Sequence, residues 1–572
     1  MISIATPIQR PSKWIDLLVM LFLAALLYGL IQFGRHLQTP LQTQVNIHLS
    51  LFSLPKYAFL SLLRASGAYI LSLLFTLAYG YTAAHVPRAD RVMIPLLDIL
   101  QSIPVLGFLP GIALTLMRLF PNTNMGLELS SILMIFTGQV WNMTFSFYQS
   151  IRTIPAELNE AASIYQFSKF QRLLRVEIPA SAVGLAWNSM MSMAGGWFFL
   201  MICETFRLSN HDFRLPGLGS YMSAAVEAHN VPAIIAGMVT MVLLIIFLDT
   251  LVWKPLIVWV QKFRLGDAAA VSVQKSRVLG WIERSPLLTM RIPNLGRKIA
   301  EILRSKLAAK RSGFSQNGRR QRQHRVIKVI LILVSICLLI LMLDGAWGLF
   351  KILIDMPLDV WGSILKGAAL TLLRVAGAVL LASLWTIPVG IWIGKSKQHI
   401  KRFQPIVQVA ASFPAPMLYP LVLIALNHLG WGLGVGSFIL MWLGVQWYIL
   451  FNVIAGASQV APEFREVAQV YGFNRRQRWM HIWWPATFPF LVTGWITATG
   501  GAWNASIVAE YATMGNKVYT THGLGSMISI AASEGNYQVL AAGILVMVLV
   551  VVLINRLLWK PLYRLAEGRY SM

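Results

Sequence analysis

The chain has 572 residues, of which 56% are hydrophobic and 12% are charged, and its formal net charge is +26. Soluble globular domains usually carry about 25% charged residues, so this composition excludes an ordinary soluble protein and indicates a membrane protein. Lys and Arg gather in the cytoplasmic loops of membrane proteins. We interpret the charge as that bias and expect the lipid bilayer, not nucleic acid, to be the partner of this basic chain.

Twelve apolar runs recur along the chain in two sets of six, and each is about long enough for a helix that crosses a bilayer. The first set covers residues 14–34, 57–84, 92–117, 130–150, 183–203 and 232–259. The second set covers residues 326–348, 361–394, 404–428, 434–457, 487–509 and 538–559. The first run is too long for the core of a signal peptide. We therefore predict an all-α polytopic membrane protein with about 12 transmembrane helices.

The distribution of basic residues predicts the orientation of these helices. If the N-terminus is cytoplasmic, residues 121–128 and 429–436 face outward, and they contain no Lys or Arg. The inward-facing gaps hold the basic residues Arg88, Arg91, Lys169, Arg172, Arg175, Lys395, Lys397, Lys401, Arg402, Arg475, Arg476 and Arg478. This asymmetry predicts a multi-pass membrane protein with both termini in the cytoplasm.

A basic polar stretch, residues 261–325, separates the two sets and predicts three parts: a first half (1–260), a cytoplasmic linker (261–325) and a second half (326–572). The linker holds sixteen Lys or Arg and three acidic residues. Residues 295–310 have amphipathic spacing and could lie on an anionic leaflet. A solvated tether that only joins the halves fits this segment equally well.

The two halves repeat each other at fixed offsets. At an offset of 306, Gly138 and Trp141 match Gly444 and Trp447, and the sequence GLGS occurs at 217–220 and again at 523–526. Nearer the start of each half the offset is 310, where 62-LLR-64 matches 372-LLR-374. Polar and aromatic residues rarely coincide in this way by chance. Six helices per half give the repeats the same orientation, which predicts a parallel pseudo-two-fold axis with a pathway at the interface.

The long inward gap after the fourth helix of each half carries the most informative pattern, at residues 157–179 and 463–485. In each copy an acidic residue begins a short helix, which is favourable against the helix dipole. Small residues follow: Ala161 and Ala162 in one copy, and Ala468 in the other. Gly472 is suited to end that helix in a left-handed conformation. A short, rigid helix on a cytoplasmic loop is suited to dock on a soluble partner.

This pattern resembles the E-A-A loop of binding-protein-dependent ABC importer permeases, E-A-A-x-x-x-G-x(9)-I-x-L-P. The second copy keeps the spacing with Glu466, Ala468 and Gly472. The first has Glu160, Ala161 and Ala162, but Gln166 replaces the glycine, so we expect two docking sites of unequal shape or strength. The helix at 371–394, the segment 412-SFPAPMLYP-420 and the residues from Glu510 to Gly525 are similar to the nitrate, sulfonate, taurine and bicarbonate branch, here with two permeases fused.

The resemblance implies partners that the chain does not encode. It implies two ABC ATPase subunits on the cytoplasmic side, which use ATP and Mg²⁺, and a periplasmic or lipid-anchored protein that delivers a small solute, with an anion favoured. The P-loop pattern G-x-x-x-x-G-K-[ST] does not occur, and its nearest match, 390-GIWIGKS-396, has one residue too few between the glycines. A self-sufficient secondary transporter with two parallel six-helix repeats is the alternative, and it leaves the paired loops unexplained.

Polar residues inside the apolar runs are the candidates for the transport pathway. Arg64 and Arg374 could attract an anion, or each could reach the membrane interface or a helix end. Glu204 and Glu510 end the fifth helices, where a structural or gating role is favoured. Neutral hydrogen-bonding side chains complete the set: Gln139, Asn142 and Gln446. His211, Asp212, Glu227 and His229 share one outer segment, where a wet loop is favoured over metal ligation. We predict no catalytic residue, bound metal or cofactor.

Overall fold

A computed structural model describes residues 45–102, 105–208, 211–263, 340, 343–460, 462–514 and 517–570. The chain divides into two compact units: Phe33–Ala268 with Pro357–Met572, and Met1–Gln32 with Ala269–Met356. In the second unit residues 343–354 are helical, and Trp347 stacks on Phe350. The predicted run 14–34, most of the run 326–348 and nearly all of the linker lie outside the described residues. The first unit holds both sets of matched helices.

The first half is almost entirely helical, and its elements follow the predicted order. They are α2 (Leu54–His85), α3 (Asp90–Ser102), α4 (Leu109–Leu119), α5 (Met125–Arg152), α6 (Ala156–Ile164), α7 (Lys169–Arg172), α8 (Ile178–Cys203), β1 (Thr205–Leu208), β2 (His211–Arg214), α9 (Leu218–Glu227), α10 (Val231–Leu248) and α11 (Lys254–Val260). Two π-helical segments, Leu173–Glu177 and Asp249–Trp253, precede α8 and α11.

The second half repeats this series element by element. Its members are α15 (Leu358–Gly394), α16 (Lys397–Ser412), α17 (Tyr419–His428), α18 (Leu433–Ser458), α19 (Pro462–Val470), α20 (Arg475–Arg478), α21 (Trp484–Ala509), β3 (Tyr511–Met514), β4 (Lys517–Thr520), α22 (Leu524–Glu534), α23 (Tyr537–Ile554) and α24 (Lys560–Tyr570). The π-helical segments recur as well, at Trp479–Trp483 and Asn555–Trp559. Local irregularities as well as helices are therefore duplicated.

Among the described residues, five helices are long and apolar enough to cross a membrane, and α16 with α17 adds a sixth if that bent pair is one span. The remaining long helices α5, α8 and α21 do not reach that hydropathy. They pack against other helices of the bundle, with α5 against α2 and α8, and α21 against α15 and α18. A helix surrounded by protein can carry polar and small residues at its contacts instead of lipid-facing apolar ones.

The prediction of one unbroken helix at 92–117 and at 404–428 was wrong. Each run is two helices joined by a short 3₁₀ segment, Val105–Phe108 in one half and Ala415–Leu418 in the other. The second pair bends by 76°, in a segment that contains Pro414 and Pro416. Proline lacks the backbone N–H that a continuing helix needs. At the first break, the side-chain oxygen of Asn504 accepts a hydrogen bond from the Val105 N–H at 2.8 Å, so the second half satisfies a backbone donor of the first.

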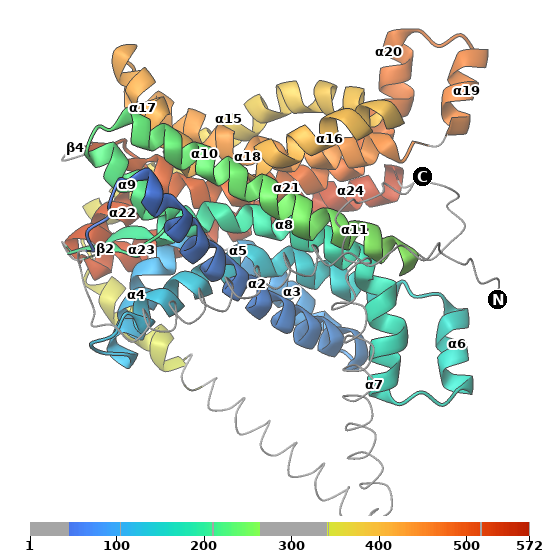
Figure 1. The fold of residues 1–572 in the computed structure, drawn as a ribbon, viewed down its shortest axis with the longest axis horizontal. Helices are drawn as coiled ribbons and strands as arrows, with labels where there is room; N and C mark the ends of the chain where they lie inside the picture. Colours follow the sequence, from blue (N-terminus) through green and yellow to red (C-terminus); the bar gives the residue numbers. More distant parts are fainter. Residues whose placement is uncertain are drawn as a thin grey trace, which may run out of the picture. The chain divides into compact units, whose positions relative to one another are not determined.

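The all-α prediction also missed two short antiparallel hairpins, β1–β2 and β3–β4, which follow α8 and α21. Their registers are equivalent, with Thr205 opposite Arg214 and Tyr511 opposite Thr520. Figure 1 shows the hairpins at one end of the long helices and the segments α6–α7 and α19–α20 at the other end. The matched loops and the matched hairpins therefore mark opposite ends of the helical bundle.

The broken helices join the two halves to each other. The α16 helix contacts α8 and α10 of the first half, while α23 contacts α3 and α21 contacts the segment Val105–Phe108. Each half thus places its broken helix against the fifth and sixth long helices of the other half. A space between the halves is bounded by these breaks and by the hairpin ends of α8 and α21.

Candidate functional site

Arg64 lies at the centre of a buried polar cluster in the first half. Its guanidinium donates to both carboxylate oxygens of Glu128, at 2.6 and 2.7 Å, and to Oε1 of Glu204 at 2.7 Å. A further bond reaches the carbonyl of Pro216 at 2.9 Å. All three charged side chains are fully buried. Charges inside a membrane protein are retained where they pair within the protein, and here the pairing ties α2 to α5 and to the end of α8.

Arg374 repeats the arrangement in the second half. It donates to Glu510 at 2.8 Å and to the carbonyl of His522 at 2.9 Å. The matched hydroxyls Ser61 and Thr371 donate to Glu204 and Glu510, at 2.6 and 2.8 Å. Arg374 has no second carboxylate among the described residues, because Gly434 stands at the position that corresponds to Glu128. Its side chain is 16% exposed, in contrast to fully buried Arg64.

The repeated GLGS sequence completes both clusters. The N–H groups of Gly219 and Gly525 donate to Glu204 and Glu510, at 2.7 and 2.8 Å. A side chain at Gly217 or Gly523 would overlap the same carboxylate. These glycines are therefore needed for a close approach of backbone to carboxylate. The sequence singled out the arginines, the glutamates and the GLGS repeat, but not Ser61, Glu128 or Thr371.

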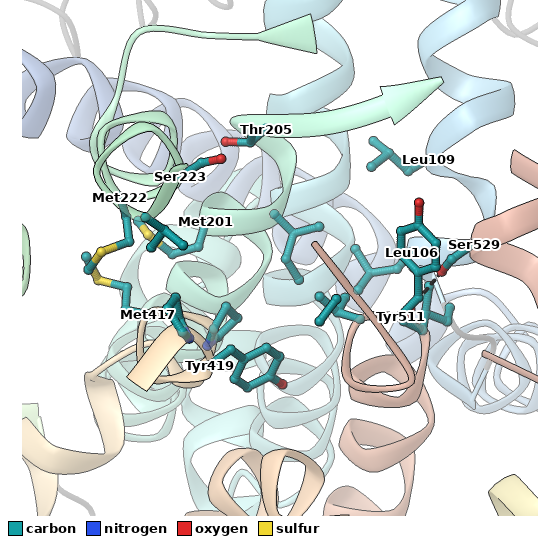
Figure 2. A pocket seen from close by; sticks show the side chains of 18 of the residues that line it. Leu106, Leu109, Met201, Thr205, Met222, Ser223, Met417, Tyr419, Tyr511 and Ser529 are labelled. Atoms are coloured by element: carbon teal, nitrogen blue, oxygen red, sulfur yellow. Dashed lines mark hydrogen bonds between the residues drawn. The ribbon is translucent and has the colours of Figure 1, made fainter. Parts of the chain in front are cut away.

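A cavity of about 280 Å³ lies between the halves at their hairpin ends. Its walls come from the ends of α8 and α21, from α9 and α22, and from the breaks at Val105–Phe108 and Ala415–Leu418. Figure 2 shows the labelled side chains of both halves around this space. The cavity therefore lies at the interface that the repeat predicts for a pathway.

Many lining residues occur in pairs at the two offsets of the repeat. Met201 pairs with Ile507, Met222 with Ile528, and Ser223 with Ser529. Three pairs differ in chemistry, and they are Leu109 with Tyr419, Thr205 with Tyr511, and Glu227 with Ser533. The cavity is thus built from duplicated elements whose side chains differ on its two sides.

The wall is mainly apolar, and hydroxyl groups interrupt it. The Ser529 hydroxyl donates to the Ile507 carbonyl at 2.7 Å, whereas the buried Tyr419 hydroxyl has no hydrogen-bond partner in the described part of the chain. Glu227 forms an ion pair with Arg214 at 2.8 Å. No Lys, Arg or His occurs among the lining residues that the structure describes. The wall thus combines apolar side chains with neutral hydroxyls and one carboxylate that is paired with an arginine.

The candidate pathway residues predicted from sequence do not line this cavity. Arg64, Arg374, Glu204 and Glu510 come together in the two clusters, and none of them lines the cavity. Three others, Gln139, Asn142 and Gln446, lie on α5 and α18, outside the lining set. Gln139 is almost fully buried, with its amide nitrogen 3.5 Å from the sulfur of Met193. Their part in transport stays a prediction.

The side chains of His211 and Asp212 lie outside the described residues. Among the residues described, no group of three or more His, Cys, Asp or Glu is arranged to hold a metal ion. Glu227 is engaged by Arg214.

The two predicted loops have the same local structure. Phe167 and Phe473 donate their N–H groups to Ala162 and Ala468 at 3.0 and 2.9 Å, which closes the ends of α6 and α19. The intervening residue is left-handed in both, with φ +62° at Gly472, as predicted, and +50° at Gln166. A capping box then begins the next helix in each copy, at Ser168 and Asn474. The substitution of Gln166 for glycine therefore leaves the backbone turn unchanged.

The surfaces of α6 and α19 differ in one respect from the prediction. Ala162 and Ala468 are buried against their own loops and do not face outward. The most exposed apolar residues are Ile164 and Tyr165 in one loop, 79% and 74% exposed, and Val470 and Tyr471 in the other, 83% and 75% exposed. Glu160 and Glu466 are also exposed. Neighbouring apolar side chains with this much exposed surface mark a contact surface. These four residues could have been found in the sequence from their matched positions in the repeat.

The family described as the binding-protein-dependent transport system inner membrane component matches residues 72–253 and 386–558, which together are more than half of the chain. The chain is 31% identical over 140 residues to the nitrate import permease protein NrtB of Synechocystis, covering 24% of this chain and 50% of the relative. It is 28% identical over 188 residues to the taurine transport system permease protein TauC of Escherichia coli, covering 33% and 64%.

A third relative is the bicarbonate transport system permease protein CmpB of Synechococcus elongatus, which is 27% identical over 140 residues, covering 24% of this chain and 49% of the relative. The chain spans about half to two thirds of the length of these curated relatives.

Replacing Arg64 with methionine should destabilise the chain by about 3–5 kcal/mol, because it removes the guanidinium from two buried carboxylates. Thermal unfolding in detergent measures the change. The control is Glu227→Gln, which breaks a partly exposed pair and should cost at most about 1 kcal/mol. Equal melting temperatures for the two variants would contradict the structural role of Arg64.

Replacing Gly472 with alanine should weaken the turn after α19 by about 1 kcal/mol, because a left-handed residue with a Cβ is disfavoured. Gln166→Gly should strengthen the matched turn after α6. Hydrogen exchange of the Phe473 and Phe167 amides reports both effects, faster in the first variant and slower in the second. Unchanged exchange in both would show that these turns do not carry the predicted strain.

Proposed function

Because the chain belongs to the family of binding-protein-dependent transport system inner membrane components, we propose that it forms the whole transmembrane pathway of an ABC-type importer. The family domain is present twice, so one chain supplies what two permease subunits supply in an importer with separate permeases. The nitrate, taurine and bicarbonate permeases that it resembles are membrane proteins of transport systems.

The duplicated loop is the observation that carries this proposal. Each half presents one short helix, α6 or α19, at the end of the bundle opposite the hairpins. The aliphatic residue that ends each helix and the tyrosine that follows it are both exposed. A pair of such surfaces fits two ATPase subunits. We therefore assign α6 and α19 as the docking elements for two cytoplasmic ABC ATPase subunits, which bind ATP and Mg²⁺.

The complete topology under this proposal has about 12 transmembrane helices in halves 1–260 and 326–572, joined by the linker 261–325. The halves are related by a pseudo-two-fold axis parallel to the membrane normal, and both termini lie on the cytoplasmic side of the inner membrane. The matched element order and the reciprocal contacts of the broken helices support this arrangement. The cavity at the hairpin end then faces the periplasm, where a binding protein delivers the solute.

The solute is proposed to be a small anion such as nitrate, a sulfonate such as taurine, or bicarbonate, since the relatives carry these names. Arg64 and Arg374 are both engaged by carboxylates and carbonyls. Anion recognition in the cavity would therefore use hydroxyl donors such as Ser223 and Tyr511 in place of a cation.

The docking role predicts that Tyr165→Ala with Tyr471→Ala will lower recovery of the ATPase with the chain by at least tenfold. Truncation of an aromatic residue central to an interface often costs about 2 kcal/mol or more, and 1.4 kcal/mol is tenfold in affinity. Glu466→Lys should act in the same direction. Co-purification from native membranes measures association, and the amount of chain in the membrane fraction measures insertion.

The control for this experiment is Leu243→Ala, which truncates an exposed apolar residue on α10, remote from the loops. It should leave ATPase recovery unchanged. Full recovery of the ATPase with the double tyrosine variant would remove the docking assignment, and absence of any ATPase from the unaltered chain would count against an ABC importer.

A further inference from the structure

The two docking helices end in the same turn and share their most exposed apolar pair and an exposed glutamate, although they belong to one continuous chain. We infer that both are occupied by copies of a single ATPase polypeptide. This inference rests on the proposed function, and it goes further because a fused permease is free to give each loop a different partner.

Three exposed positions of the two loops correspond. Ile164 corresponds to Val470, Tyr165 to Tyr471 and Glu160 to Glu466, and the exposed fractions of the two tyrosines are 74% and 75%. The basic positions after the turn also correspond, with Lys169 and Arg172 matched by Arg475 and Arg478. A pocket that accepts one aliphatic–aromatic pair beside an acidic residue will accept the other.

The replacement of the loop glycine by Gln166, from which we expected unequal docking sites, does not change the backbone. Gln166 adopts the left-handed conformation of Gly472, and the hydrogen bonds on either side of it are the same. An interface distinguishes partners by the shape and charge that it presents, and the three matched positions present the same shape and charge. The loops differ around them: α19 also exposes Phe464 and Val467, 45% and 49%, and the second loop has Arg476 where the first has Phe170.

The test uses the full chain with its native partners. One variant replaces residues 157–172 with the sequence of 463–478, and a second makes the converse replacement, so that both docking loops become identical. Native mass spectrometry of the purified complexes gives the number and identity of the ATPase subunits. We expect two copies of one ATPase on the unaltered chain and on both variants, with ATPase activity within about twofold.

Two different ATPases on the unaltered chain, or the loss of one subunit from either loop-replaced variant, would overturn the single-partner inference and leave the importer proposal standing. Recovery of no ATPase from any of the three chains would instead refute the importer proposal. The two failures are therefore distinguishable in one experiment.

A second inference concerns the route from the cavity toward the docking loops. The ring of Tyr448, on α18, lies against Gly501 of α21, 3.1 Å from where a Cβ would be, and its hydroxyl lies 3.8 Å from the corresponding point of Gly195 on α8. Gly195 and Gly501 are equivalent in the repeat. We propose that Tyr448 is the residue that closes the pathway beneath the cavity.

The positions of Gly195 and Gly501 along their helices support the closing role of Tyr448. Gly195 and Gly501 lie six residues before the cavity residues Met201 and Ile507, which is about 9 Å along a helix axis. At this level both α8 and α21 lack a side chain, so an aromatic ring from α18 reaches across the interface of the halves. The equivalent position in the first half is Asn142, so a single ring from one side forms the closure.

Proteoliposomes that contain the permease–ATPase complex test this closure with nitrate as the probe. Tyr448→Ala should raise nitrate leak in the absence of ATP at least fivefold, whereas Tyr448→Phe, which keeps the ring, should leave it unchanged. A leak equal to that of the unaltered complex would overturn the proposal.

A labelling experiment keeps this proposal testable if the alanine variant fails to fold. Tyr448→Cys, in a background with Cys203→Ala and Cys337→Ala, should react with a small thiol reagent faster during ATP turnover than at rest. Equal reaction rates in the two conditions would show that position 448 does not open, and would overturn the assignment.

Discussion

The buried bond between an arginine of the second long helix and a glutamate at the end of the fifth is the constraint on which the rest of each half depends. In the first half, Glu204 accepts from Arg64, Ser61 and the N–H of Gly219. An ionised carboxylate in a low-dielectric interior is tolerated only with such partners. Gly219 lies in the first turn of α9, so the carboxylate also fixes where α9 starts. Because α9 supplies Met222, Ser223 and Glu227 to the cavity, the ion pair sets the position of that wall.

The two halves differ in the residues that line the cavity. They agree in the exposed apolar pairs at α6 and α19, the elements proposed to dock the ATPase subunits. The cavity has Leu109 and Thr205 on one side and Tyr419 and Tyr511 on the other, whereas the exposed apolar pairs of α6 and α19 are alike. Two identical permease subunits could not combine an asymmetric cavity with matched docking helices. Fusion of two halves into one chain permits this combination. Each half can change its cavity-lining residues independently while both keep the same backbone at α6 and α19.

Residue type and spacing were sufficient to predict the duplication and to single out the loops, the arginines and the glutamates, since matched charged residues in apolar runs have few explanations. Contacts between distant segments were not predictable. Glu128 is one glutamate among several in the sequence, and only the fold places it beside Arg64. By hydropathy, the breaks at Val105–Phe108 and Ala415–Leu418 cannot be told from continuous apolar helices. At the first break, the Val105 N–H is satisfied by the side chain of Asn504 in the other half. Burial of Ala162 and Ala468 likewise depends on the loop folding back on itself.

The positions of these features on α8 and α21 explain how work at the docking loops could reach the cavity. Each of the two helices begins next to a docking loop, through the segments Leu173–Glu177 and Trp479–Trp483, and ends at Glu204 or Glu510. At 26 residues, each is about 39 Å long. A helix packed on several sides moves as a rigid body. A tilt imposed at α6 or α19 must therefore displace Met201 or Ile507 in the cavity wall and Gly195 or Gly501 beside Tyr448. Under the proposed function, the docking loop, the closure at Tyr448 and the cavity lie in series on one rigid element of each half, so a displacement of α6 or α19 reaches the other two.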